Sequence, residues 1–325
     1  MKLFLVLAVL AFATALPVNR RFWFIPDDEG KVHLVDTQST PKIIDPVDGR
    51  NFTFYLYTPL NKDEPFIFNG EELDLLFEAG VFDPNLPSLF TTHGWGGSGE
   101  STSVTGVKDS ILASNDLNVF CLDWSGPAGE FYTLARSYVN PVGDLIGEAI
   151  NEIIDHYQVD ASTVNLMGHS LGGQLVGRIG RTASGRLGSI VALDPAWPGF
   201  SLDNLDDRLD TTDAQFVQVI HVNSGFLGYP YSVGHADFYL NGGVKQPGCG
   251  PDIIGTCSHF LIKDMILYTY SSAFMAVKCN SYEDYVDGGC SDNSQSYWGG
   301  WPVDTSAIGD YYMDTEGEPP FVIES

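Results

Sequence analysis

Ser170 is the residue of this chain best placed for covalent chemistry, because it is the centre of the pentapeptide Gly-His-Ser-Leu-Gly at 168–172. A serine in this spacing acts as a nucleophile when it lies on a sharp turn between a strand and a helix. The apolar residues 164–167 predict a strand before it, and residues 171–181 predict a helix after it. This flanking pattern indicates a hydrolase that transfers acyl groups.

Asp194 and His259 are the candidate partners of Ser170, because acid and base follow the nucleophile in the order serine, acid, histidine. Asp194 follows an apolar strand at 190–193 and precedes a proline that must end it. His259 comes two residues after Cys257, in an expected loop ahead of a helix at 260–270. In these roles His259 takes the serine proton, and Asp194 fixes the tautomer of the ring.

The backbone N–H groups of Trp95 and Leu171 are the candidates for an oxyanion hole. Trp95 follows a predicted strand at 88–92, and the glycine pair at 96–97 lets the main chain come close to a substrate. We interpret the nearby His93 and His169 as supports for the geometry of these loops.

Other residues compete for the same roles on sequence alone. His221 and His235 are alternative bases, and Asp237 and Asp210 are alternative acids. His221 lies inside a predicted strand, where histidines more often belong to a hydrogen-bonded core. The sequence favours His259 and Asp194.

Strands and helices alternate along the chain. Strands are predicted at 52–58, 88–92, 117–122, 164–167, 190–193 and 216–222, and helices at 104–113 and 142–157. In the second helix, apolar residues recur every three or four positions and give one stripe that faces a sheet. Such alternation predicts an α/β fold with a mostly parallel central sheet and helices on both faces.

The two ends of the chain differ from its centre. Residues 1–15 combine one lysine, an apolar run and small residues, which predicts a secretory signal peptide and an extracellular product. The predicted α/β domain covers 16–290. Residues 291–325 are expected to be a loop-rich acidic tail, too short for a β-sandwich domain.

The charge of the chain excludes some classes of partner. With 42 acidic and 16 Lys and Arg residues, the net charge is -26, which argues against nucleic acid and against docking on anionic lipid. After the signal, no segment has the roughly 20 apolar residues of a transmembrane helix.

Cysteine spacing and one sequon fit an exported protein. The spacing suggests disulfides Cys249–Cys257 and Cys279–Cys290, although four cysteines allow three pairings. Cys121 lies in a predicted strand and is expected to be a buried free thiol. Asn51 begins the N-glycosylation sequon Asn-Phe-Thr.

Six motifs in order resemble the pancreatic lipase family, and most closely its insect neutral lipases. They are Gly168 to Gly172, Leu193-Asp194-Pro195-Ala196, His93-Gly94-Trp95, Cys121-Leu122-Asp123-Trp124, Gly234-His235-Ala236-Asp237-Phe238 with Asn241-Gly242-Gly243, and Cys257-Ser258-His259. The resemblance implies an α/β-hydrolase fold that hydrolyses glycerolipid esters. It implies Ser170, Asp194 and His259 as the triad, with Trp95 and Leu171 as the oxyanion hole.

Departures from the vertebrate digestive members refine this expectation. Those members carry a long lid bounded by a disulfide, whereas here only residues 250–256 separate Cys249 from Cys257. Seven residues make at most about 10 Å of helix, too little to cover a groove for an acyl chain. The loop at 223–234 is short as well. Members with these two features resemble phospholipases of the A1 type. Without a lipid-binding sandwich domain, no dependence on colipase is expected.

The resemblance also implies a structural calcium ion. Arg208 would contribute its carbonyl oxygen, and Asp210 and Asp213 their carboxylates. Where vertebrate members have a glutamate ahead of the arginine, this chain has Leu205. A solvated acidic turn is the alternative. No cofactor is expected for the chemistry itself.

The predicted function is a secreted serine hydrolase acting on glycerolipid esters at a lipid–water interface, with phospholipase A1 or triacylglycerol lipase activity in lipid catabolism. The rival is a non-catalytic protein that binds or stores lipid, because insect yolk proteins resemble this family without the nucleophile. The intact serine, acid and histidine positions favour the enzyme.

Overall fold

A computed structural model describes residues 21–39, 41 and 46–323, so the predicted signal peptide lies outside the described residues. Its centre is an eleven-stranded sheet in the order β12-β11-β13-β10-β9-β8-β7-β5-β6-β3-β4. The middle strands run parallel. They are β6 (Asn118–Asp123), β5 (Ser88–Thr92), β7 (Val164–His169), β8 (Ser189–Leu193), β9 (Phe216–His221), β10 (Ala236–Leu240) and β13 (Gly309–Met313).

Antiparallel strands flank the parallel centre on both sides. β3 (Thr53–Tyr57) and β4 (Phe66–Asn69) lie beyond β6, and β11 (Met275–Lys278) and β12 (Gln295–Tyr297) lie beyond β13. Strands buried on both faces read as continuous apolar runs, which explains why β5 to β9 are recognisable in the sequence. The prediction of a mostly parallel sheet is confirmed.

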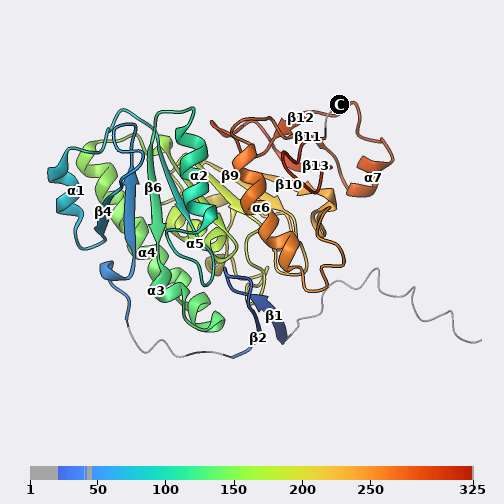
Figure 1. The fold of residues 1–325 in the computed structure, drawn as a ribbon, viewed down its shortest axis with the longest axis horizontal. Coiled ribbons are helices and arrows are strands. Elements are labelled where there is room, and N and C mark those ends of the chain that lie inside the picture. The colour runs from blue at the N-terminus through green and yellow to red at the C-terminus, as the bar shows by residue number, and fades with distance from the viewer. Residues whose placement is uncertain (1–20, 40, 42–45, 324–325) are drawn as a thin grey trace, which may run out of the picture.

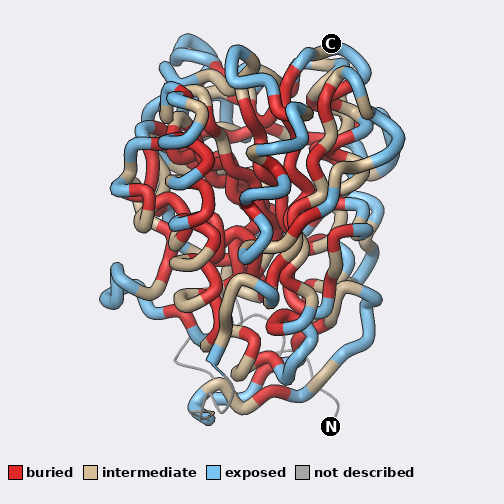
Figure 2. The backbone as a smooth tube through the Cα atoms, turned by 90° about the vertical axis from the view of Figure 1, so that its left-hand side faces the viewer, coloured by how far each residue is buried: buried red, intermediate tan, exposed pale blue. Residues whose placement is uncertain are grey.

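Helices cover both faces of the sheet (Figure 1). The core on one face includes apolar residues of α4 (Tyr132–Tyr157) and α5 (Leu171–Thr182), and the core on the other includes those of α2 (Thr102–Leu112) and α6 (Thr256–Tyr268). Buried backbone fills the middle of the molecule, with exposed loops around it (Figure 2). The α/β-hydrolase fold predicted from the sequence is therefore confirmed.

The remaining elements are short. They are α1 (Leu73–Ala79), α3 (Ser125–Ala128), α7 (Tyr282–Val286) and the 3-10 turns η1 (Gly49–Asn51), η2 (Ala161–Thr163), η3 (Leu205–Asp207), η4 (Thr211–Asp213) and η5 (Asn241–Gly243). Strands β1 (Phe22–Pro26) and β2 (Val32–Asp36) form a separate antiparallel hairpin. In Figure 1 this hairpin lies at the lower edge of the molecule.

Two parts of the chain differ from the predicted elements. Residues after Cys290 are not simply a loop-like tail, because β12 and β13 join the main sheet and Tyr311 and Met313 are buried. Their pairing partners lie far away in sequence, which a local pattern does not reveal. Helix α4 begins ten residues before the predicted start at 142 and contains Pro141 in its interior. Proline usually marks a helix boundary, so the pattern indicated a later start.

The structure contains the disulfides Cys249–Cys257 and Cys279–Cys290, and Cys121 is a buried free thiol. Burial raises the pKa of Cys121 to about 12, which leaves the thiol protonated and inert. Asn51 is partly exposed, and its Oδ1 accepts a hydrogen bond from the Asp48 backbone in the cap of η1. Within the described residues, no helix is long and apolar enough to cross a membrane.

Candidate active site

Ser170 occupies the turn between β7 and α5 with φ 56° and ψ -119°, a conformation that L-residues rarely adopt. The turn is tight enough to require glycine on both sides. A Cβ on Gly168 would lie 2.2 Å from the Gly172 carbonyl oxygen, and one on Gly172 would lie 2.4 Å from that of His93. The strand, turn and helix predicted for the pentapeptide are present, and Ser170 remains partly exposed.

The sheet register brings the acid to the same edge as the serine. His169, the last residue of β7, pairs with Leu193, the last residue of β8, and Ser170 and Asp194 directly follow these two strands. The backbone N–H of Ser170 donates to the Leu193 carbonyl at 3.0 Å. Asp194 and Ser170 therefore share the carboxyl edge of adjacent parallel strands, where α/β proteins place their sites.

His259 lies between them. Its Nε2 is 2.9 Å from Ser170 Oγ, and its Nδ1 is 2.6 Å from Asp194 Oδ2. The sequence predicted a loop at His259, but this residue belongs to the first turn of α6, where its N–H donates to the Gly255 carbonyl. Asp252 caps this turn by accepting hydrogen bonds from the N–H groups of Cys257 and Ser258. With these N–H groups paired, α6 begins at Thr256, four residues before the start at 260 that the apolar residues indicate.

Asp194 is fully buried, and each of its carboxylate oxygens has partners. Oδ1 accepts hydrogen bonds from the backbone N–H groups of Val222 (2.9 Å) and Asn223 (3.0 Å), while Oδ2 faces His259. Its φ of 42° turns the side chain out of β8. A buried carboxylate held by two backbone N–H groups is fixed in one orientation, which suits it to orient an imidazole.

Of the two candidate oxyanion donors, Leu171 directly follows Ser170, and Trp95 directly follows Gly94, which lies against Ser170. The N–H of Leu171 is the first of α5 and has no partner within the helix. Trp95 is fixed at two points, because its carbonyl accepts from Asp28 N (3.1 Å) and its Nε1 donates to the Glu130 carbonyl (2.8 Å). A Cβ on Gly94 would lie 3.1 Å from Ser170 Cβ, so glycine keeps this space open.

His93 and His169 support the loops, as interpreted from the sequence. His93 accepts a hydrogen bond from Trp124 N at Nε2 and contacts the Gly94 carbonyl through Nδ1. His169 donates from Nε2 to the His259 carbonyl at 3.0 Å. Burial holds the pKa of His169 well below its ordinary value, so the ring stays neutral beside the base.

The competing residues lie elsewhere. His221 Nε2 contacts Asp237 Oδ1 at 2.8 Å in the interior, and Asp237 also accepts from two backbone N–H groups of the loop before β10. His235 Nδ1 accepts from Val217 N. Asp210 caps η4. None of these hydrogen bonds includes Ser170.

Hairpin β1–β2, which was not predicted from the sequence, links the Trp95 segment to α6. Asp28, at its tip, accepts hydrogen bonds from Ser101 and from Lys263 of α6 (3.0 Å), and its N–H donates to Trp95. The alternation of apolar residues on both sides of Gly30 is a hairpin signal that would have indicated the element. Its contacts with Trp95 and with Lys263 of α6 have no local signal in the sequence.

Two of the three predicted calcium donors, the Arg208 carbonyl and the Asp213 carboxylate, instead accept hydrogen bonds from the guanidinium group of Arg181. Arg181 donates to the carbonyl oxygens of Leu205 (2.6 Å) and Arg208 (3.3 Å) and to Asp213 Oδ1 (3.0 Å). Within the described residues, no group of three His, Cys, Asp or Glu side chains is arranged to hold a metal ion. Because a fixed cation already takes these oxygens, the loop in this conformation does not fit calcium, and no step below depends on the ion.

The sheet, the strained serine turn and the histidine and aspartate beside it define an α/β hydrolase. Comparison with known families then places it more closely: residues 28–321 match the Lipase family, so the chain belongs to that family. The resemblance to pancreatic lipases is confirmed by the relatives that the chain matches.

Three relatives illustrate this similarity. The chain is 33% identical to pancreatic lipase-related protein 2 of Bos taurus, over 73% of this chain and 55% of the relative. It is 32% identical to lipase member H of Rattus norvegicus (82% and 58%) and 32% identical to phospholipase A1 member A of Bos taurus (74% and 53%). The chain thus spans little more than half the length of these relatives.

Proposed function

We propose that this chain is a secreted serine hydrolase that cleaves acyl chains from glycerolipids at a lipid–water interface. The observation that carries the proposal is the continuous line of hydrogen bonds from Ser170 Oγ through His259 to Asp194, with distances of 2.9 and 2.6 Å. Membership of the Lipase family and the names of its relatives support the same class of substrate.

The first half of the reaction forms an acyl-enzyme. Ser170 Oγ attacks the ester carbonyl carbon while His259 Nε2 accepts the hydroxyl proton. The negative charge that develops on the carbonyl oxygen is stabilised by the N–H groups of Trp95 and Leu171. His259 then gives the proton to the leaving alcohol as the ester bond breaks. Asp194 holds the ring in place and stabilises the imidazolium throughout.

The second half releases the fatty acid. A water molecule attacks the acyl carbon, His259 takes its proton, and the same two N–H groups stabilise the second tetrahedral intermediate. The bond to Ser170 Oγ then breaks, and His259 returns the proton to the serine. The lysolipid or diglyceride and the fatty acid are the two products.

The short loop between the cysteines supports a phospholipid substrate over triglyceride. In the structure this loop forms turns at residues 250–255, its ends are 5.5 Å apart at Cα, and α6 begins at Thr256. Ser170 remains partly exposed. A phospholipid head group needs an open approach to the serine, whereas a long lid would restrict it. We therefore infer phospholipase A1 activity as the main reaction.

The outer face of hairpin β1–β2 supports contact with lipid. Phe22 and Phe24 are each 56% exposed and Leu34 is 65% exposed, while the opposite face, with Trp23 and Ile25, is buried. Exposed apolar side chains gathered on one face mark interaction surfaces. Because Asp28 at the tip of this hairpin donates a hydrogen bond to the Trp95 carbonyl, lipid bound on the outer face of the hairpin lies near the site.

Secretion is supported by the two disulfides, which persist in oxidising compartments. The large negative charge favours a neutral or zwitterionic lipid surface over an anionic one. A role in lipid catabolism follows from the proposed chemistry.

Assays on purified protein test the proposal. Release of fatty acid from phosphatidylcholine vesicles and from triolein emulsion is compared, together with labelling by a fluorophosphonate probe. The proposal expects labelling and faster turnover of phosphatidylcholine. Brisk triolein turnover with negligible phospholipid turnover would reject the phospholipid preference. A folded protein that stays unlabelled and inactive would favour the non-catalytic lipid-binding function.

A further inference from the structure

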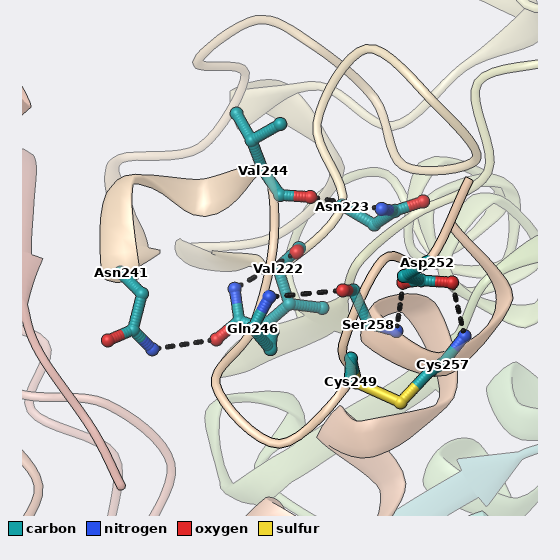
Figure 3. The surroundings of a disulfide bond; sticks show 9 residues. All are labelled: Val222, Asn223, Asn241, Val244, Gln246, Cys249, Asp252, Cys257 and Ser258. Atoms are coloured by element: carbon teal, nitrogen blue, oxygen red, sulfur yellow. Dashed lines mark hydrogen bonds between the residues drawn. A yellow bond between two sulfur atoms is a disulfide. The ribbon is translucent and has the colours of Figure 1, made fainter. Parts of the chain in front are cut away.

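We propose that Gln246 is a positioning residue that fixes the base, His259, relative to the acid, Asp194. Gln246 lies between η5 and the Cys249–Cys257 disulfide, and it is buried, with 4% of its surface exposed. Its contacts reach both the peptide that holds Asp194 and the residue before His259 (Figure 3). The inference rests on the proposed function, because it assigns Gln246 to the same reaction.

The peptide group between Val222 and Asn223 links Gln246 to Asp194. Gln246 Nε2 donates to the carbonyl oxygen of Val222 at 3.0 Å. That carbonyl shares its peptide plane with the N–H of Asn223, which donates to Asp194 Oδ1 at 3.0 Å. In a trans peptide the C=O and N–H point in opposite directions. By holding the carbonyl, Gln246 therefore aims the N–H at the carboxylate.

The link to His259 passes through Ser258. The backbone N–H of Gln246 donates to Ser258 Oγ at 3.0 Å, and Ser258 immediately precedes His259 in the first turn of α6. The disulfide ties Cys249 to Cys257 in the same turn, so residues 246–258 form a loop closed at both ends. Movement of Gln246 would be transmitted to the peptides that carry the two partners of the proton transfer.

The remaining hydrogen bonds of Gln246 leave its side chain no freedom. Nε2 also donates to the Leu240 carbonyl at 2.8 Å, and Oε1 accepts from Asn241 Nδ2 at 2.8 Å. Each amide hydrogen and the amide oxygen thus has a partner in the interior. A fully bonded buried amide keeps one orientation, which a positioning residue requires.

Gln246→Met tests the inference, because it keeps the length of the side chain and removes all three hydrogen bonds of the amide. We expect kcat and the rate of fluorophosphonate labelling to fall about 10- to 100-fold, with KM within about twofold, because small misplacements of reacting groups cost this much. The downfield proton NMR signal of the His259 Nδ1 hydrogen should broaden or disappear.

Gln218→Met is the matched control. Gln218 is also fully buried, and its Oε1 accepts from Gly299 N at 2.8 Å, but none of its hydrogen bonds reaches the candidate triad. We expect a comparable loss of Tm with kcat, labelling and the NMR signal retained. Equal effects of Gln246→Met and Gln218→Met on kcat would overturn the inference.

Ser258→Ala provides a second test that removes only the acceptor of the Gln246 N–H. We expect a smaller fall in kcat than in Gln246→Met. In the double variant Gln246→Met and Ser258→Ala, the fold-loss of kcat should be less than the product of the two single fold-losses. Should Gln246→Met fail to fold, wild-type kcat in Ser258→Ala would overturn the inference. Failure of the proposed function can be distinguished from failure of this inference. If the proposed function is wrong, wild-type protein stays unlabelled, whereas the NMR signal of His259 still shows whether Gln246 positions the ring.

Discussion

Gly228 lies directly against the carboxylate of Asp194: a Cβ on this glycine would stand 2.3 Å from Oδ1 and 2.5 Å from Oδ2. Real Cβ atoms do not come this close to other heavy atoms, so a side chain here would force either the carboxylate or the loop of Gly228 to shift. The acid is thus positioned by the absence of a side chain on the neighbouring loop as well as by the N–H groups of Val222 and Asn223.

Gly228→Ala should therefore lower kcat by about 100-fold, because it misplaces the group that orients the base. Gly126→Ala is the control, since a Cβ there meets nothing within 4 Å. Kinetics with a soluble short-chain ester measure both variants. Wild-type kcat in folded Gly228→Ala would show that the carboxylate has room to adjust.

The ion pair between Asp28 and Lys263 predicts a dependence of stability on pH. Burial raises the pKa of Asp28, but the Lys263 ammonium and the Ser101 hydroxyl together outweigh this, so the net pKa lies below its ordinary value. A lowered folded-state pKa stabilises the protein above the ordinary carboxyl range, and the contribution is lost as the pH falls below about 4.

Asp28→Asn should lower the free energy of unfolding by about 1 kcal/mol at neutral pH. The difference from wild type should shrink as the pH falls below about 4, because the charge of Asp28 then contributes progressively less to stability. Urea denaturation at several pH values measures it. A difference that stays constant down to pH 3 would contradict the assigned role of this ion pair.

The outer face of hairpin β1–β2 should matter for lipid aggregates and not for soluble substrate. In the double variant Phe22→Ser and Phe24→Ser we expect about a 30-fold loss of activity on phosphatidylcholine vesicles, because two exposed apolar contacts worth roughly 1 kcal/mol each are removed. Hydrolysis of a soluble ester should stay unchanged.

Leu60→Ser is the control for this surface. Leu60 is 92% exposed, but it follows β3, whose end lies at the opposite edge of the sheet from Ser170, because Tyr57 pairs with Val119 near the start of β6. Equal losses on vesicles in both variants would mean that lipid contact is not localised at the hairpin.

The short loop at 250–255 predicts hydrolysis without interfacial activation. With no long lid to move, the rate on a short-chain phosphatidylcholine should rise smoothly with concentration through the point where micelles form. Titration of the initial rate across that concentration tests this. A sharp increase at micelle formation would indicate that another segment covers the site.

Strands β5 to β9 were predictable because each contains a short run of apolar residues, and the boundaries of β5 agree with the prediction at both ends. The hairpin β1–β2 and the late strands β10 to β13 were not predicted. Strands β11 to β13 lie at or near the edge of the sheet, where fewer residues are buried, and their pairing is non-local.

The residues of the candidate site could be predicted because each of them belongs to a short motif, and the motifs occur in a fixed order along the chain. Ser170, Asp194 and His259 come together as the motifs indicated. The motifs do not predict the residues that hold these three side chains in position. These residues are Gly228, Gln246 and Asp28. Each of them contacts a segment that is far away in the sequence, so no local pattern indicates its role.

Substitution of the nucleophile tests the central claim most directly. Purified wild type and Ser170→Ala are compared for release of fatty acid from phosphatidylcholine, with circular dichroism and Tm as checks of folding. We predict loss of more than about 1,000-fold of the wild-type rate, with the fold intact. Fatty acid release at the wild-type rate from folded Ser170→Ala would contradict the account.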